Sequence, residues 1–263
     1  MSDRKPKSLR ERGLKVLRAL VVPVVLLVAW RLAVQWKLVN PLLLAPPEKV
    51  ITRAVQEVSE GELFKQVLAS VQRDLIGFAI GTFAGIVVGG FMGASKVVDR
   101  VVGPTFHAFK QVAIFAWIPL MSVWFGTGEL AKVAFIAFSA FFPVVLNTYE
   151  GVRGVSRQYV EVARVFRFTP WQVARRVVLP AAAPSIFAGI QLALFYAWLG
   201  TLGAEFLLAA GPGVGNLMVD GRESFAMDKV LLGVIIAGAV GAGLNAAATA
   251  LEQRTLRWRV RGV

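Results

Sequence analysis

The stretch SVQRDLIGFAIGTFAGIVVGGFMG, residues 70–93, is an apolar run in which glycine recurs at every fourth position. A helix needs about 20 apolar residues to cross the hydrocarbon layer of a bilayer, and this run is long enough. Spacing of four puts the glycines on one helix face, where another backbone can approach closely. We therefore predict a spanning helix packed through Gly77, Gly81, Gly85, Gly89 and Gly93. A helix of the same subunit is the favoured partner, and a second subunit is the alternative.

The whole chain has the composition of a membrane protein. Its 263 residues are 56% hydrophobic and only 17% charged, which is too apolar for a soluble domain of this length. We predict an all-α, polytopic protein in which a single domain, residues 16–251, lies between basic tails at 1–15 and 252–263. Six transmembrane helices are expected, near residues 16–36, 70–93, 104–125, 130–149, 184–208 and 229–251.

The basic residues are sorted along the chain. Despite the net charge of +13, Lys and Arg do not form one soluble patch of the kind that binds nucleic acid, but gather in alternate connections, at 4–18, 96–100, 153–176 and 254–261. Cytoplasmic loops of membrane proteins carry such an excess. We therefore predict cytoplasmic termini and a cytoplasmic loop at about 150–183. The first apolar segment is expected to remain as a helix and not to be a cleaved signal, since Arg31 interrupts it.

Several kinds of chemistry are excluded by residue type. The chain has no cysteine and a single histidine, His107, so thiolate and histidine-cluster metal sites cannot form. It has no clustered catalytic set and no GxxxxGK[ST] phosphate-binding loop. We expect no catalytic residue, no metal and no bound cofactor, so an energised transporter would need a separate ATPase.

The loop YVEVARVFRFTPWQVARRVVLPAAAP, residues 159–184, separates two apolar segments. Residues 161–166 have helical composition. Thr169 is a favourable N-cap residue, and Pro170 follows it at the first helical position, where proline is common. We predict two short helices, the second of which ends at Pro180.

This loop resembles the EAA loop of bacterial ABC importer permeases, whose consensus is Glu-Ala-Ala, three residues, Gly, nine residues, Ile, one residue, Leu-Pro. Glu161, Ala163, Leu179 and Pro180 match it, whereas Arg167 stands in place of the glycine. From about Leu44 to Trp258 the chain is also similar to the sulfonate, taurine and nitrate permease subfamily. The segments that carry this likeness are WIPLMSVWFGTGELAKVAF, FFPVVLNTYEGVRGV and LEQRTLRW.

The resemblance implies the type I ABC importer permease architecture in the bacterial inner membrane. It implies a loop that docks on an ATPase subunit through Glu161, Ala163, Arg167, Pro170, Trp171, Leu179 and Pro180. The expected partners are two ATPase copies that use ATP and Mg, a second permease subunit forming a homodimer, an extracytoplasmic solute-binding protein and the lipid bilayer, and no nucleic acid. Arg167 implies either a differently shaped turn or a charged contact to the ATPase.

The solute pathway is less well marked. Ionisable residues within spans are the first candidates, and here they are Glu205, Lys110 and His107. Contact with lipid headgroups is the alternative for Lys110. An aliphatic sulfonate or taurine is the favoured solute, followed by nitrate or bicarbonate and by a heterocyclic vitamin precursor. An ATP-independent secondary transporter or channel is the alternative from another class.

Overall fold

The computed structural model describes residues 9–40, 43–208 and 211–255, and every regular element in these ranges is a helix. The outer parts of the predicted basic tails, residues 1–8 and 256–263, lie outside the described residues. Residues 209 and 210, at the start of a glycine-rich turn, also lie outside them. The all-α prediction is thus confirmed for the described part of the chain.

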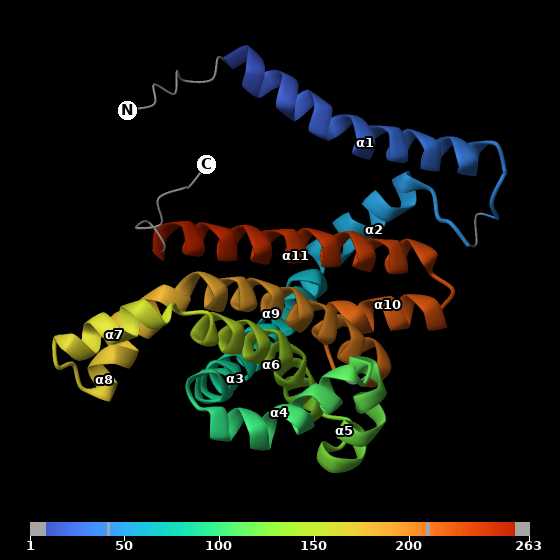
Figure 1. The fold of residues 1–263 in the computed structure, drawn as a ribbon. Helices are drawn as coiled ribbons and strands as arrows, with labels where there is room; N and C mark the ends of the chain where they lie inside the picture. Colours follow the sequence, from blue (N-terminus) through green and yellow to red (C-terminus); the bar gives the residue numbers. More distant parts are fainter. Residues whose placement is uncertain (1–8, 41–42, 209–210, 256–263) are drawn as a thin grey trace. The chain divides into compact units, whose positions relative to one another are not determined.

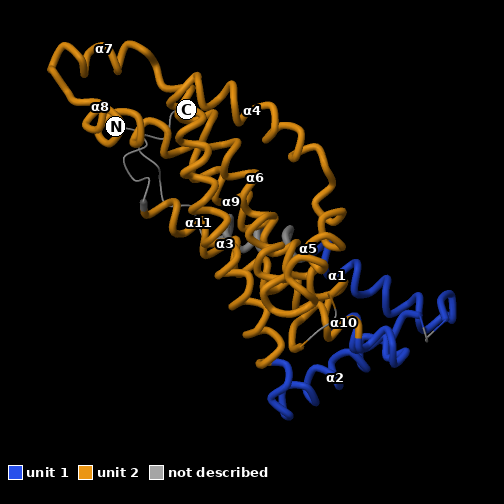
Figure 2. Tube along the Cα trace, turned by 90° about the horizontal axis from the view of Figure 1, so that it is seen from below, with its two compact units in different colours: residues 1–63, 220–232 blue, residues 64–219, 233–263 orange. Residues whose placement is uncertain are grey.

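The chain divides into two compact units, coloured separately in Figure 2. One unit comprises residues 1–63 and 220–232. Its main helices are α1 (Leu9–Gln35) and the amphipathic α2 (Pro47–Ser59), which begins directly after Pro46. The Trp30 indole donates to the carbonyl of Ala45 (3.1 Å), and Arg53 donates to Asp228 (3.0 Å).

The other unit comprises residues 64–219 and 233–263 and holds the longest helices (Figure 1). Its elements, some of which begin or end in the first unit, are α3 (Glu62–Ala94), α4 (Lys96–Gln111), η1 (Ile114–Trp117), α5 (Ile118–Phe125), α6 (Glu129–Arg153), α7 (Arg157–Val165), α8 (Pro170–Val173), η2 (Ala174–Val178), α9 (Leu179–Leu208), α10 (Val214–Glu223) and α11 (Met227–Thr255).

Four helical segments among the described residues are long and apolar enough to cross a membrane: 62–94, 129–153, 170–208 and 227–254. A fifth span is possible if α4 and the segment Ile114–Phe125 count together, although they are bent by 98°. The span expected near 104–125 is therefore not one continuous helix, and whether it crosses the membrane stays a prediction. The chain leaves the helical conformation at Val112, and Pro119 lies in the first turn of α5, where proline is well tolerated. In α1 the described apolar part is Val21–Gln35, so the six-span count stays a prediction.

The second loop helix does not end at Pro180, contrary to the prediction. Residues 170–208 form one helix of 39 residues. A π-helical turn, η2, comes directly before the proline, and the Leu179 N–H donates to the Ala174 carbonyl five residues back. The wider turn makes room for a proline ring that would otherwise clash with a carbonyl of the preceding turn. The helix therefore runs unbroken out of the loop.

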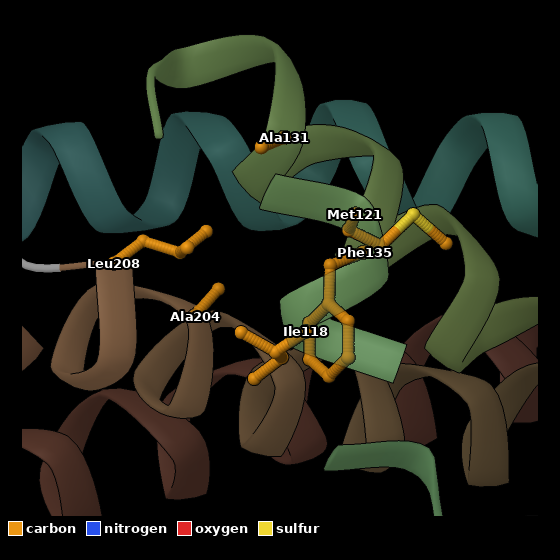
Figure 3. Packing of buried hydrophobic residues seen from close by; sticks show 6 residues of the cluster. All are labelled: Ile118, Met121, Ala131, Phe135, Ala204 and Leu208. Carbon is orange, nitrogen blue, oxygen red and sulfur yellow. The ribbon is translucent and has the colours of Figure 1, made fainter. Parts of the chain in front are cut away.

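One of the apolar clusters of this unit joins α5, α6 and α9. Ile118 and Met121 of α5 pack against Phe135 of α6 and Ala204 of α9, and Ala131 and Leu208 complete the cluster (Figure 3). The five glycines that recur at every fourth position of α3 face α6: a methyl group added at Gly85 would lie 2.7 Å from Val144 Cβ, and one at Gly93 would lie 2.8 Å from Val152 Cβ. The glycine face thus meets a helix of the same chain.

Candidate functional site

Residues 157–178, comprising α7, α8 and η2, form a helical hairpin that we call the connecting hairpin. Figure 1 shows it projecting at one end of the unit, beyond α6 and α9. Its apolar side chains are unusually exposed: Val165 is 81%, Trp171 72% and Phe166 70% exposed. Glu161 is its only acidic residue, and its basic residues are Arg157, Arg164, Arg167, Arg175 and Arg176. A surface that is both apolar and strongly basic is suited to a protein partner with acidic groups.

The turn between α7 and α8 is held by local hydrogen bonds. Thr169 forms the predicted cap, and the structure adds a reciprocal bond: Gln172 N–H donates to Thr169 Oγ1 (3.3 Å), while Thr169 N–H donates to Gln172 Oε1 (2.8 Å). At the end of α7, Arg167 N–H donates to the Arg164 carbonyl (2.9 Å) and Phe168 N–H to the Ala163 carbonyl (3.0 Å). These two bonds form a Schellman motif.

Arg167 takes the position in this motif that glycine usually takes. Its φ is +55°, in the left-handed region that costs an L-residue about 1–2 kcal/mol relative to the right-handed one. The replacement of glycine by Arg167 has therefore not removed the left-handed turn. The sequence allowed either a differently shaped turn or a charged contact to the ATPase. The left-handed turn is kept at Arg167, so the charged contact is the alternative that stays open.

The other predicted coupling residues divide between the surface and the inside of the hairpin. Glu161, Pro170 and Trp171 are exposed, as are Leu179 and Pro180 on the long helix. Ala163, in contrast, is only 4% exposed. Its small side chain packs inside the hairpin and so cannot offer much surface to a partner.

A buried charge cluster, made of Ser70, Arg73, Glu129 and Glu205, joins the helices α3, α6 and α9. Arg73 Nη1 donates to Glu205 Oε1 (2.6 Å) and Nη2 to Glu129 Oε1 (2.8 Å), and Arg73 Nε also donates to Glu129. Ser70 Oγ lies 2.8 Å from Glu205 Oε1. The Glu205 side chain is completely buried, whereas that of Glu129 is 60% exposed. The guanidinium thus bridges one buried and one exposed carboxylate.

The segment after α9 closes over the Glu205 carboxylate. The Gly215 N–H donates to Glu205 Oε2 (2.9 Å), and the Val214 N–H donates to Ser70 Oγ (2.8 Å). A methyl group added at Gly213 would lie 2.5 Å from Glu205 Cδ, so only glycine leaves room there. This glycine-rich turn therefore supplies backbone donors to a buried anion.

Two further buried ionisable residues lie beside this cluster. Asp74 Oδ1 accepts from Thr201 Oγ1 (3.1 Å), so Asp74 and Arg73 are neighbours in sequence with different partners, as the helix geometry predicts. Lys132, one turn after Glu129, is completely buried. The sequence analysis identified Glu205 but not its pairing with Arg73. Charges buried in membrane helices are normally paired, and this rule could have directed the search for a basic partner of Glu205.

His107 and Lys110 lie on α4, outside the buried charge cluster. His107 is exposed and its ring meets that of Phe106 edge to face, with the centroids 5.5 Å apart. Lys110 is half-buried in the last turn of α4, where a cation is favourable to the helix dipole. The structure therefore does not bring the three candidate pathway residues together.

Comparison with known proteins identifies similar chains. Residues 81–257 match the family model described as "Binding-protein-dependent transport system inner membrane component". The chain is 35% identical to the "Putative aliphatic sulfonates transport permease protein SsuC" of Bacillus subtilis (strain 168), over 92% of this chain and 88% of that protein. It is 31% identical to the "Taurine transport system permease protein TauC" of Escherichia coli (strain K12), over 89% and 86%.

The fold is also found among solved structures. A chain of the MetNI methionine ABC transporter, in an inward-facing conformation, matches with a TM-score of 0.57 at 19% identity. The match covers 72% of this chain and 95% of that one. At this identity the likeness concerns the fold alone.

Proposed function

The chain belongs to the family of binding-protein-dependent transport system inner membrane components, and we propose that it carries a small organic sulfonate across the membrane as the permease subunit of an ATP-driven importer. It is an ABC importer permease of the sulfonate, taurine, nitrate and bicarbonate type. The observation that carries the coupling to ATP is the connecting hairpin, an exposed apolar and basic surface at the end of a long spanning helix.

The length of that helix supports a docking role for the hairpin. At 1.5 Å per residue, its 39 residues extend about 58 Å, about twice the hydrocarbon thickness of a bilayer. Even at a tilt of about 40° the helix would rise about 44 Å. The half that carries Arg175 and Arg176 therefore extends out of the hydrocarbon, where a peripheral subunit can reach the hairpin.

The unbroken helix also provides a mechanism. We propose that ATP binding draws two ATPase copies together and that the docked hairpins move with them. Because residues 170–208 form one helix, movement at Trp171 passes directly into the span, and the pathway opens alternately to the two sides. The docking face would be contacted or shaped by Glu161, Arg167, Pro170 and Trp171. The buried Ala163 would stabilise the packing of the hairpin. Movement would enter the spanning helix through Leu179 and Pro180.

The proposed assembly has two copies of this chain, two ATPase subunits that hold ATP and Mg, and an extracytoplasmic protein that delivers the solute. It is placed in the bacterial inner membrane, with six spans and cytoplasmic termini. The basic connections at 96–100 and 153–176 support this orientation. Pairing with a different permease subunit is the alternative to a homodimer.

A sulfonate is the favoured solute because relatives named for aliphatic sulfonates and taurine match over most of the chain. Relatives named for bicarbonate and nitrate match over a smaller share, 74% and 70% of this chain. These anions are therefore the next candidates, and a heterocyclic vitamin precursor follows. The test is uptake into proteoliposomes that hold the chain with its ATPase and binding protein, comparing alkanesulfonates, taurine, nitrate and bicarbonate. ATP-dependent uptake of one solute supports the proposal, and ATP-independent flux would move the chain to the secondary-transporter or channel class.

Truncating Trp171 is expected to weaken ATPase association. The Trp171→Ala variant loses a large exposed apolar side chain, and such anchors typically contribute about 2 kcal/mol or more to an interface. The expected result is an affinity reduced about 30-fold, with ATP-dependent uptake reduced in parallel. Binding of the detergent-solubilised permease to the purified ATPase measures it.

The matched control is Trp124→Ala on α5. Trp124 is similarly exposed, at 60%, but lies outside the connecting hairpin. It should leave ATPase affinity unchanged. Equal losses in the two variants, or intact association and uptake with both Trp171→Ala and Glu161→Lys, would show that the hairpin is not the docking site.

A further inference from the structure

Arg167 is disfavoured by its own chain in two independent ways. Its φ of +55° is a conformation in which glycine is preferred, because a Cβ atom crowds the backbone there. The connecting hairpin also carries five arginines and one glutamate, so a neutral residue at 167 would reduce repulsion between like charges. Both backbone and local charge would therefore favour glycine at this position.

The Arg167 side chain gains nothing in return within the described part of the chain. It is exposed, and its guanidinium makes no hydrogen bond or ion pair there; only its backbone N–H is bonded, to Arg164. Arg176, by comparison, lies over the ring of Phe168 at 5.8 Å. A residue that is unfavourable in the isolated subunit, and whose side chain makes no hydrogen bond or ion pair with the described residues, indicates a partner outside the chain.

The surroundings of Arg167 indicate a protein carboxylate as that partner. Val165 and Phe166 directly precede it and are among the most exposed apolar residues of the chain, so the arginine lies at the edge of an apolar docking face. The length of the helix that follows allows this face to lie outside the hydrocarbon, where a protein subunit can reach it. Guanidinium groups bind carboxylates through two parallel hydrogen bonds, a geometry that an ammonium cannot reproduce.

We propose that Arg167 pairs with an aspartate or glutamate in the docking groove of the ATPase and restricts this permease to ATPases that are acidic at that point. This inference rests on the proposed docking role of the connecting hairpin. The left-handed turn keeps the hairpin in shape, and the arginine adds partner choice at the expense of the turn's own stability. Electrostatic pairs of this kind select partners because a neutral or basic residue opposite leaves the charge unpaired.

The test separates conformation from charge at one position. Arg167→Gly relaxes the turn and removes the charge, Arg167→Asn tolerates the left-handed conformation without charge, and Arg167→Lys keeps both the charge and the disfavoured conformation. Affinity for the purified ATPase is measured for each full-length permease at low and high salt. The Gly and Asn variants should bind about tenfold more weakly than wild type and lose much of the salt dependence, with Lys in between. Binding by Arg167→Gly that equals or exceeds wild type overturns the proposal.

Charge reversal identifies the partner residue. Arg167→Glu should bind weakly to the natural ATPase and regain affinity when one acidic groove residue of the ATPase is changed to Arg. If no single reversal restores binding, the pairing is wrong. Proteoliposomes with and without anionic phospholipid form the remaining arm: if Arg167→Gly lowers uptake only in the anionic proteoliposomes while ATPase affinity is unchanged, the arginine contacts lipid headgroups and the proposal fails.

The Trp171→Ala variant distinguishes failure of this inference from failure of the proposed function. Loss of association with Trp171→Ala but not with Arg167→Gly leaves the hairpin as the docking site and removes only the role of Arg167. If neither variant affects association, the docking site lies elsewhere, and both the docking role of the connecting hairpin and the pairing of Arg167 are wrong.

Discussion

The Glu205→Ala variant should lose about 3–5 kcal/mol of unfolding free energy, because it leaves Arg73 partly unpaired in a buried site. The Arg73 side chain is only 7% exposed, and Glu205 lies 2.6 Å from its Nη1. The truncation also removes the acceptor of the Gly215 N–H, and a buried donor without a partner adds to the loss. Thermal unfolding of the purified protein in detergent measures the effect, which should appear as a large fall in the midpoint temperature.

Two further variants test whether the burial of the Arg73–Glu205 pair is the reason for the loss of unfolding free energy in Glu205→Ala. Glu129→Ala removes the other carboxylate bound to Arg73, but that carboxylate is 60% exposed and its pair is screened by solvent, so the loss should be about 1 kcal/mol. The double variant Arg73→Met/Glu205→Leu replaces the buried pair with apolar groups of similar size and should recover much of the stability lost in Glu205→Ala. If Glu205→Ala unfolds at the wild-type temperature, the buried charge cluster does not hold these helices together.

The Gly81→Ala variant should lose about 2–3 kcal/mol, the upper part of the range for overpacking. A Cβ atom at Gly81 would lie 2.9 Å from the side chain of Ala140 and about 3.0 Å from the backbone carbon of Ala137 on α6. A backbone cannot move aside as a flexible side chain can, so α3 and α6 would have to separate. The unfolding midpoint in detergent reports the change.

Gly90 on the same helix is the matched control. A methyl group added there would meet no atom within 4 Å, so Gly90→Ala introduces no clash. It should be neutral or stabilising by up to about 1 kcal/mol through helix propensity. Opposite shifts in the two variants identify close packing as the cause, whereas equal shifts would contradict it.

The predictions from the sequence agree best with the structure where residues close together in the sequence determine the conformation. The cap at Thr169 depends on residues three positions apart, and the glycine face of α3 depends on a spacing of four; both were predicted from the sequence. Pro180 is the counterexample. A proline usually ends a helix, but the π turn before it lets residues 170–208 continue as one helix.

The candidate sites divide in the same way. The connecting hairpin is continuous in sequence, so its exposed aromatic and basic character could be predicted from composition alone. The buried charge cluster joins Arg73, Glu129 and Glu205 from three helices. No local pattern relates residues so far apart in the sequence, and only the packing of the helices shows which charges pair.

Sequence patterns alone were enough to predict an all-helical membrane protein with a long basic loop between two apolar segments, because apolar length, glycine spacing and capping are properties of short segments. The tertiary structure decided the bend of 98° between α4 and the next helices and the burial of Glu205 beneath the Gly213–Gly215 backbone. These features depend on where distant segments meet, since a buried charge is tolerated only when the surrounding structure supplies its partners and its space.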